Sequence, residues 1–127
     1  MADAQTVTGP LDGLRVVEMG QLIAGPFCGQ LLGDLGAEVV KIEPPGEGDT
    51  MRRWGQGPAP LSWRVIARNK YSVEIDLRSV EGQDVARRLI GVADILIENF
   101  RPGTLERWGL DPKKLCEENK KLIVVRV

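Results

Sequence analysis

The sequence predicts an α/β fold of the Rossmann-like layered type, with a mostly parallel sheet between helices. Short segments rich in Val, Ile and Leu recur along the chain, and segments with helical spacing of apolar residues separate them. Most of the short segments are apolar at consecutive positions, which is typical of parallel strands covered on both faces. The 127 residues have the length of one domain. We expect a polar leader over residues 1–10 and one segment of an α/β domain over residues 11–127.

Five strands are expected from these segments. Two prolines follow the second strand and end it, because proline cannot donate to a central ladder. The third strand alternates apolar and polar residues with period two, and the others are apolar runs. The expected strands cover residues 14–19, 38–43, 72–77, 95–98 and 122–127.

Two longer helices are expected between the strands. Pro26 suits a first helical position because its missing N–H is unpaired there in any case, and Gly36 ends that helix. Ser79 can cap a second helix that runs to about residue 92. The apolar positions at helical spacing are Phe27, Leu31, Leu32 and Leu35 in the first helix and Val85, Leu89 and Ile90 in the second.

The rest of the chain is expected to hold shorter elements. A helical turn is indicated over residues 104–108, and Asp111 before Pro112 is a good helix start. Residues 44–70 lose their periodicity, and a loop of that length in a compact domain is usually functional or packed against something else. The chain ends in an apolar strand with no covering helix after it. Since apolar edge strands associate, we expect the chain to be a truncated, N-terminal part of a larger domain.

Composition excludes several classes of function. Seventeen basic and 18 acidic residues leave a net charge of −1, which argues against general nucleic-acid or membrane-surface binding. Cys28 and Cys116 lack paired spacing, and the chain has no histidine, so no metal site is expected. No secretory or mitochondrial signal and no membrane span is visible. We therefore expect a cytoplasmic protein.

The segment GQLIAGPFC, residues 20–28, joins the first strand to the first helix, where nucleotide-binding folds keep a phosphate loop. It lacks the G-x-G-x-x-G fingerprint, and Glu43 at the end of the next strand is weak support for a ribose site. On pattern alone, a tight connection that binds no ligand is favoured.

The segment IENFRPG, residues 97–103, is a second candidate. Asn99 and the backbone of Phe100 can hydrogen-bond an amide or adenine edge, and Arg107 can pair with phosphate as a bidentate donor. An Asx-turn and a solvated arginine explain the same residues equally well. Three further arginines, Arg52, Arg53 and Arg68, could line a phosphate site or stand on the surface.

Taken in order, five blocks resemble the family III CoA-transferases, which include formyl-CoA transferase, carnitine CoA-transferase and α-methylacyl-CoA racemase. The blocks are LDGLRVVEM, AGPFCGQLLGDLGAEVVKIEPPGEGD, RNKYSVEIDL, ADILIENFRPGTLERWGL and LIVVRV. They cover nearly the whole chain from Leu11 onward. Five collinear blocks are far more specific than any one of them.

The resemblance implies a binding site for coenzyme A or acyl-CoA as substrate. It implies that the apolar first turn meets the uncharged pantetheine arm. By position in the family pattern, Leu22, Ile23 and Ala24 line the arm, Ile75 contacts the nucleotide, Asn99 and Phe100 face adenine and ribose, and Arg107 meets the phosphates.

Two positions depart from some family members. Pro44 stands where some members carry an arginine, so Arg52 or Arg68 would have to replace that phosphate contact. Ile23 stands where formyl-CoA enzymes carry a glutamine at the reacting carbonyl, which disfavours formyl or oxalyl chemistry.

The implied activity is transfer of CoA between an acyl-CoA and a carboxylic acid through an aspartyl-CoA thioester. The resemblance places the catalytic aspartate beyond Val127, so we expect no catalytic residue in this chain and no turnover by it alone. An interlocked homodimer is implied for full-length members. The alternatives are a 2-methylacyl-CoA racemase and a non-catalytic CoA- or nucleotide-binding module. The sequence does not name the acyl donor or acceptor.

Overall fold

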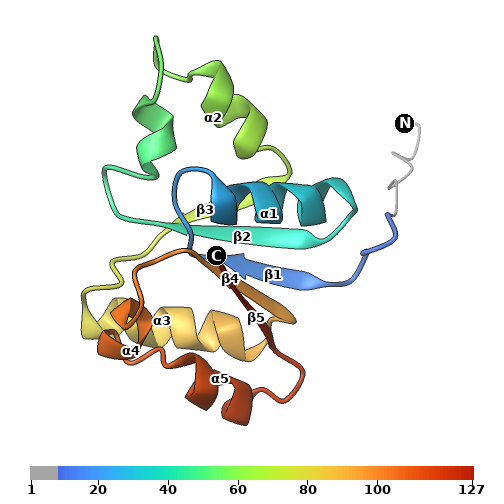
Figure 1. Cartoon of the computed structure of the whole chain (residues 1–127), viewed down its shortest axis with the longest axis vertical. Coiled ribbons are helices and arrows are strands. Elements are labelled where there is room, and N and C mark those ends of the chain that lie inside the picture. The colour runs from blue at the N-terminus through green and yellow to red at the C-terminus, as the bar shows by residue number, and fades with distance from the viewer. Residues whose placement is uncertain (1–8) are drawn as a thin grey trace, which may run out of the picture.

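The computed structural model describes residues 9–127, and most of the expected leader over residues 1–10 lies outside them. It confirms the α/β fold with a parallel sheet: five strands pair side by side, all parallel, in the order β3-β2-β1-β4-β5 (Figure 1). The strands are β1 (Arg15–Glu18), β2 (Glu38–Glu43), β3 (Lys70–Glu74), β4 (Ile95–Glu98) and β5 (Ile123–Arg126).

The strand order reverses its direction at the centre of the sheet. β1 pairs with β2 on one side and with β4 on the other. The loops that leave β1 and β4 therefore diverge to opposite faces, and this arrangement opens a crevice at the carboxyl edge of the sheet. Both candidate segments from the sequence, 20–28 and 97–103, follow these two strands.

Helix α1 (Ala24–Asp34) begins two residues before the expected start, so Pro26 is its third residue. This position tolerates proline because the first four N–H groups of a helix have no partner within it. Gly36, at φ 102°, follows the helix as expected.

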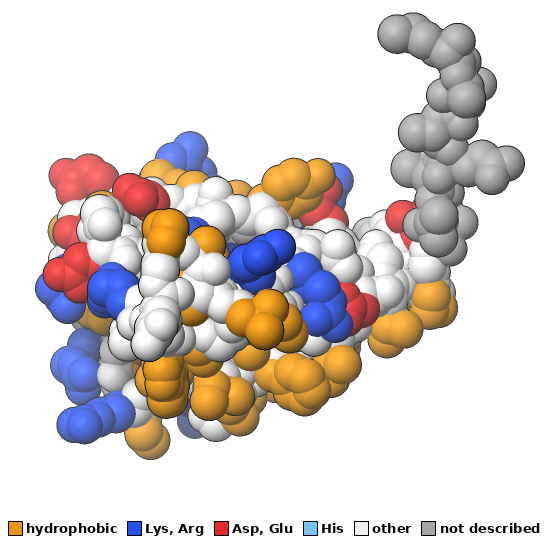
Figure 2. Space-filling model, turned by 90° about the horizontal axis from the view of Figure 1, so that it is seen from above, with side chains coloured by type: hydrophobic (Ala, Val, Ile, Leu, Met, Phe, Trp, Pro, Cys, Tyr) orange, Lys and Arg blue, Asp and Glu red, His pale blue; other side chains and the backbone are white. Residues whose placement is uncertain are grey.

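Three of the four apolar side chains expected to face the sheet from α1 point away from it, and of these four only Leu32 packs against the core. Small residues and Gln30 are buried instead, and a ridge at four-residue spacing stays about half exposed: Ile23, Phe27, Leu31 and Leu35. Figure 2 shows hydrophobic side chains gathered along one edge of the molecule. Close approach explains the inversion, because a Cβ on Gly29 would lie 2.0 Å from the Glu18 carboxylate oxygen Oε2.

Residues 44–69 contain two short helices that the sequence did not predict, η1 (Thr50–Arg53) and α2 (Leu61–Ile66). The side chain of Asp49 caps η1 by accepting a hydrogen bond from Met51 N at 2.9 Å. β3 lies two residues earlier than expected because its ladder with β2 ends with the pair Glu43 and Glu74, just before the prolines that stop β2.

The second half of the chain holds α3 (Val80–Gly91), α4 (Thr104–Arg107) and α5 (Pro112–Glu118). The expected caps are confirmed, since Ser79 Oγ accepts from Gly82 N at 3.0 Å and Asp111 Oδ1 accepts from Lys113 N at 2.9 Å. On α3 the prediction is wrong at Val85, which is exposed, because Ala86 and Ile90 take the positions that face the sheet.

Two apolar cores lie on the two faces of the sheet. Val17 and Leu96 pack with α3, α4 and α5, whereas Val16 and Ile97 pack with residues of α1. Coverage on both faces, which the sequence predicts for most of the strands, holds for the central strands only. The outer strands β3 and β5 are largely exposed. Among residues 9–127, no helix has the length and hydrophobicity needed to cross a bilayer.

Candidate functional site

A cavity of about 420 Å³ lies at the carboxyl edge of the sheet. Its wall comes from residues that end or follow four strands: Met19 after β1, Glu43 in β2, Ile75 after β3 and Phe100 after β4. This is the edge at which open parallel sheets bind ligands, and the volume falls within the range of small-molecule sites.

Two of the expected site residues, Ile75 and Phe100, line this cavity together. Trp108, at the end of α4, also lines it and holds the Phe100 ring edge-to-face, with ring centroids 5.2 Å apart. Arg78 brings a cation to the wall. Sequence reasoning missed Arg78, although a basic residue directly after the third strand was a usable signal.

Asn99 does not line the cavity but ties its two central loops together. Its Nδ2 donates to Gln21 O and its Oδ1 accepts from Gln21 N, both at 2.8 Å. Gly20 is required beside it, because a Cβ there would lie 2.8 Å from the same Oδ1. Both hydrogen-bonding groups of the Asn99 amide are engaged within the protein, and Gln21 forms part of the cavity wall.

Leu22, Ile23 and Ala24 continue from this wall toward α1 and stand outside the cavity itself. Leu22 adopts φ 66°, and the side chains of Leu22 and Ile23 are 36% and 53% exposed. The loop therefore presents two large apolar side chains to solvent beside the cavity.

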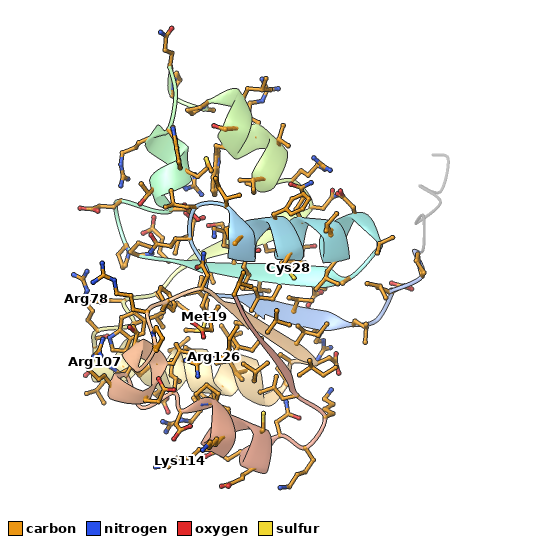
Figure 3. The ribbon with its side chains drawn as sticks, viewed as in Figure 1. Met19, Cys28, Arg78, Arg107, Lys114 and Arg126 are labelled. Atoms are coloured by element: carbon orange, nitrogen blue, oxygen red, sulfur yellow. The ribbon has the colours of Figure 1, made fainter. Side chains whose placement is uncertain are left out.

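Arg107 stands on α4, where its Nη2 donates to Thr104 Oγ1 at 3.1 Å, and it does not line the cavity. Figure 3 shows Arg107 and Arg78 at the same end of the molecule, with Met19 further inside. Both arginines are exposed.

A buried cluster of four charged residues lies beneath the first loop, and the sequence analysis did not anticipate it. The Lys41 ammonium meets Glu18 Oε1 at 2.8 Å, Asp49 Oδ2 at 2.8 Å and Gly20 O at 2.7 Å. Lys70 meets Glu18 Oε2 at 2.6 Å. Burial lowers the pKa of Lys70, and the Glu18 carboxylate opposes that shift. Glu18, Lys41 and Lys70 are charged residues within strands of the sheet, and this feature of the sequence could have indicated a buried charged cluster.

Glu43 forms a second charged centre, in the cavity wall. Arg52 donates to both of its carboxylate oxygens at 2.7 Å, and Ser72 and the Asp49 N–H also donate to it. Burial raises the pKa of Glu43, but these hydrogen bonds outweigh burial and lower it to about 2. Arg52 also stacks over the Trp63 ring at 4.1 Å.

The two arginines that could replace the missing phosphate contact are thus already paired. Arg52 holds Glu43, and Arg68 holds Asp34 at the end of α1. Within residues 9–127 no three Cys, Asp or Glu side chains gather in a way that could hold a metal ion.

The pKa of the Cys28 thiol is raised, mainly because the thiol is partly buried and secondarily because of the nearby negative charge of Glu18.

Comparison with known proteins identifies the family of the chain. The model of the family described as CoA-transferase family III matches residues 11–127. The chain belongs to CoA-transferase family III. The resemblance seen in the five sequence blocks is therefore confirmed.

Relatives in this CoA-transferase family are considerably longer than the chain. Succinyl-CoA–D-citramalate CoA-transferase of Chloroflexus aurantiacus is 56% identical over 121 residues, which are 93% of this chain and 30% of that protein. The β subunit of succinyl-CoA–L-malate CoA-transferase from the same organism is 48% identical, over 98% of this chain and 32% of that subunit. The chain spans about a third of the length of the curated relatives it matches.

A solved structure shows the same fold for this part of the family. A CAIB/BAIF family protein from Brucella suis superposes with a TM-score of 0.88 at 42% identity, over 94% of this chain and 33% of that protein.

Proposed function

We propose that this chain supplies the coenzyme A-binding part of a CoA-transferase that moves CoA from an acyl-CoA donor to a carboxylic acid. One observation carries the proposal: in a member of this family, the cavity lies at the carboxyl edge of four parallel strands and is bordered by an exposed apolar loop. We further propose succinyl-CoA as the donor. The two relatives reported above are both named for succinyl-CoA, with D-citramalate and L-malate as the other substrates in their names.

In the proposed complex the ligand runs from the cavity across Gln21 to the loop that precedes α1. The nucleotide lies against Ile75 and Phe100, whose apolar wall suits the face of an adenine ring. The uncharged pantetheine arm then passes over Leu22 and Ile23. The exposed apolar surface of these residues supports that path, since covering it removes nonpolar area from water.

The remaining expected residues take supporting roles in this proposal. Ala24 continues the arm contact at the start of α1, and Asn99 acts through its hold on Gln21. The phosphates meet exposed guanidinium groups at that end of the molecule, those of Arg107 and Arg78, which can bind a phosphate with two N–H donors.

The chemistry we propose passes through a carboxylate outside the described residues. An aspartate attacks the thioester carbonyl and expels the CoA thiolate, which leaves a mixed anhydride. The thiolate then attacks the aspartyl carbonyl, releases the donor acid and forms the aspartyl-CoA thioester, and the acceptor acid reverses both steps. Glu43 is unsuited to that role because Arg52 and Ser72 occupy both of its oxygens.

Calorimetric titration of the chain with coenzyme A tests the binding proposal. We expect saturable binding, and at least tenfold weaker binding in Phe100→Ala, since that change removes one wall of the cavity. Trp54→Ala is the matched control, because Trp54 is an exposed aromatic residue outside the cavity wall. A folded chain that shows no binding heat with coenzyme A or succinyl-CoA would refute the proposal.

A segment exchange tests the transfer reaction. The matching third of the D-citramalate relative is replaced by this chain, and the chimera is given succinyl-CoA with labelled carboxylic acids. We expect label to enter the acyl-CoA pool. Exchange of the α-proton of a 2-methylacyl-CoA without transfer would instead support the racemase alternative.

We also propose that full-length members with this segment are homodimers, which light scattering on the chimera would check.

A further inference from the structure

The backbone of the loop after β1 adopts a conformation that its own sequence does not favour. Leu22 has φ 66°, in the left-handed region that residues with a Cβ rarely occupy. Such a conformation persists only where surrounding contacts impose it. The loop nevertheless leaves Leu22 and Ile23 about a third to a half exposed, so burial of these side chains does not impose it.

Four hydrogen bonds from other parts of the fold hold three consecutive residues of this loop. Lys41 Nζ donates to Gly20 O at 2.7 Å, Asn99 pairs with both backbone groups of Gln21, and Asp49 Oδ1 accepts from Leu22 N at 3.0 Å. The last of these bonds reaches the residue with positive φ.

Lys41 and Asp49 also bind each other, and their hydrogen bonds with Gly20 and Leu22 connect the loop after β1 to β2 and to the loop that follows β2. The Lys41 ammonium meets Asp49 Oδ2 at 2.8 Å, and the two side chains are only 2% and 0% exposed. The Asp49 side chain also accepts a hydrogen bond from Met51 N, and the backbone N–H of Asp49 donates to Glu43 Oε2 at 2.7 Å. Residues of both loops line the cavity, so the hydrogen bonds from Lys41 and Asp49 to the first loop link two parts of its wall.

Stability alone does not account for a lysine in the middle of β2. Burying a charged pair costs desolvation free energy that its attraction only partly returns, and well-packed apolar residues are often as stable or more so. What the pair supplies here, and an apolar pair could not, is a donor for Gly20 O and an acceptor for Leu22 N.

We propose that Lys41 and Asp49 are positioning residues for coenzyme A. They hold the loop over residues 20–23 in the shape that presents Leu22 and Ile23 to the pantetheine arm. This inference rests on the proposed function for its ligand, but the geometry of the loop can be tested without any ligand.

Two substitutions of Asp49 separate positioning from support of the fold. Asp49→Asn keeps one side-chain oxygen for the Leu22 and Met51 amides and removes the charge that faces Lys41. Asp49→Ala removes the accepting oxygen as well as the charge. We expect both variants to unfold at lower denaturant concentration. Only Asp49→Ala should bind coenzyme A at least tenfold more weakly, while Asp49→Asn should stay within threefold of the unmodified chain.

Asn119→Ala is the matched control for a lost buried polar group. Asn119 is buried, its Nδ2 donates to Ile90 O and Ala93 O at 3.1 and 2.8 Å, and it lies at the amino edge of the sheet, away from the cavity. The Asn119→Ala substitution should lower the stability of the fold and leave the affinity for coenzyme A unchanged. Equal losses of affinity in Asn119→Ala and Asp49→Ala would overturn the proposal, as would unchanged affinity in folded Asp49→Ala.

Amide hydrogen exchange at Leu22 gives the readout that needs no ligand. We expect exchange at least tenfold faster in Asp49→Ala and near-normal exchange in Asp49→Asn. Unchanged protection of Leu22 in Asp49→Ala would overturn the proposal. If the unmodified chain does not bind coenzyme A, the proposed function fails by itself, and the exchange result still decides whether Asp49 holds the loop.

Discussion

Replacement of Glu43 by glutamine should destabilise the chain by an amount that depends on pH. The buried carboxylate receives four hydrogen bonds, from Arg52 Nε, Arg52 Nη2 and Asp49 N at 2.7 Å and from Ser72 Oγ at 2.6 Å. These bonds lower its pKa from 4.5 to about 2. A difference of that size corresponds to ~3 kcal/mol, and we expect ~2 kcal/mol because Arg52 is 39% exposed and its charge is screened by solvent.

The sign of the pH dependence follows from the direction of the pKa change. Because the pKa is lower in the folded chain, the stabilisation is fully present above about pH 5 and is lost as the pH falls toward 2. Glutamine does not titrate, so the difference between the two proteins should shrink on acidification. More than half of the ~2 kcal/mol difference should be gone by about pH 3.

Urea unfolding at several pH values between 3 and 7 measures this difference, and thermal unfolding at pH 7 should show a midpoint lower by about 8 °C. Asp84→Asn is the control, because Asp84 pairs with Arg88 on the exposed surface of α3 and should contribute under ~0.5 kcal/mol at any pH. A Glu43→Gln difference that is equal at pH 3 and pH 7 would refute the reasoning.

Three further substitutions test other contacts. Gly29→Ala should destabilise by ~1–3 kcal/mol in urea unfolding despite the better helix propensity of alanine, because its Cβ would meet the Glu18 carboxylate; a stabilised variant would contradict this. Asn99→Asp should cost ~1–3 kcal/mol at pH 7, since a carboxylate oxygen would replace the amide that donates to Gln21 O; undiminished thermal stability would count against that bond. Leu105→Ala should cost ~2–5 kcal/mol by calorimetry, because Leu105 is fully buried; a loss below ~1 kcal/mol would show that this core can close around the gap.

Part of the cavity wall could be predicted from the sequence, because the collinear blocks that resemble the family mark positions near strand ends. The family resemblance pointed to Ile75 and Phe100, and the structure places both in one cavity. The binding roles of all seven expected residues remain predictions. Trp108 was missed as part of the cavity wall because nothing in its local sequence marks it, whereas the position of Arg78 directly after the expected third strand was a signal that went unused.

The prediction was weaker where distant contacts set the structure. The sequence pattern favoured Phe27 and Leu31 as the apolar face of α1, yet they stay half exposed. The helix turns its small residues inward because Gly29 must pass the Glu18 carboxylate, which is itself fixed by two lysines from other strands. No local pattern contains that information.

The sequence by itself determined the class of fold, the strands and the caps at Ser79 and Asp111, because these depend on residue spacing and on hydrogen bonds within a few positions. The tertiary structure alone decided what shapes the loop after β1. Lys41 and Asp49 lie far from Gly20 and Leu22 along the chain, and only the parallel pairing of β1 with β2 brings their charges to that loop. Charge pairing inside the protein depends on distance in space, and the order of residues does not specify that distance until the sheet has formed.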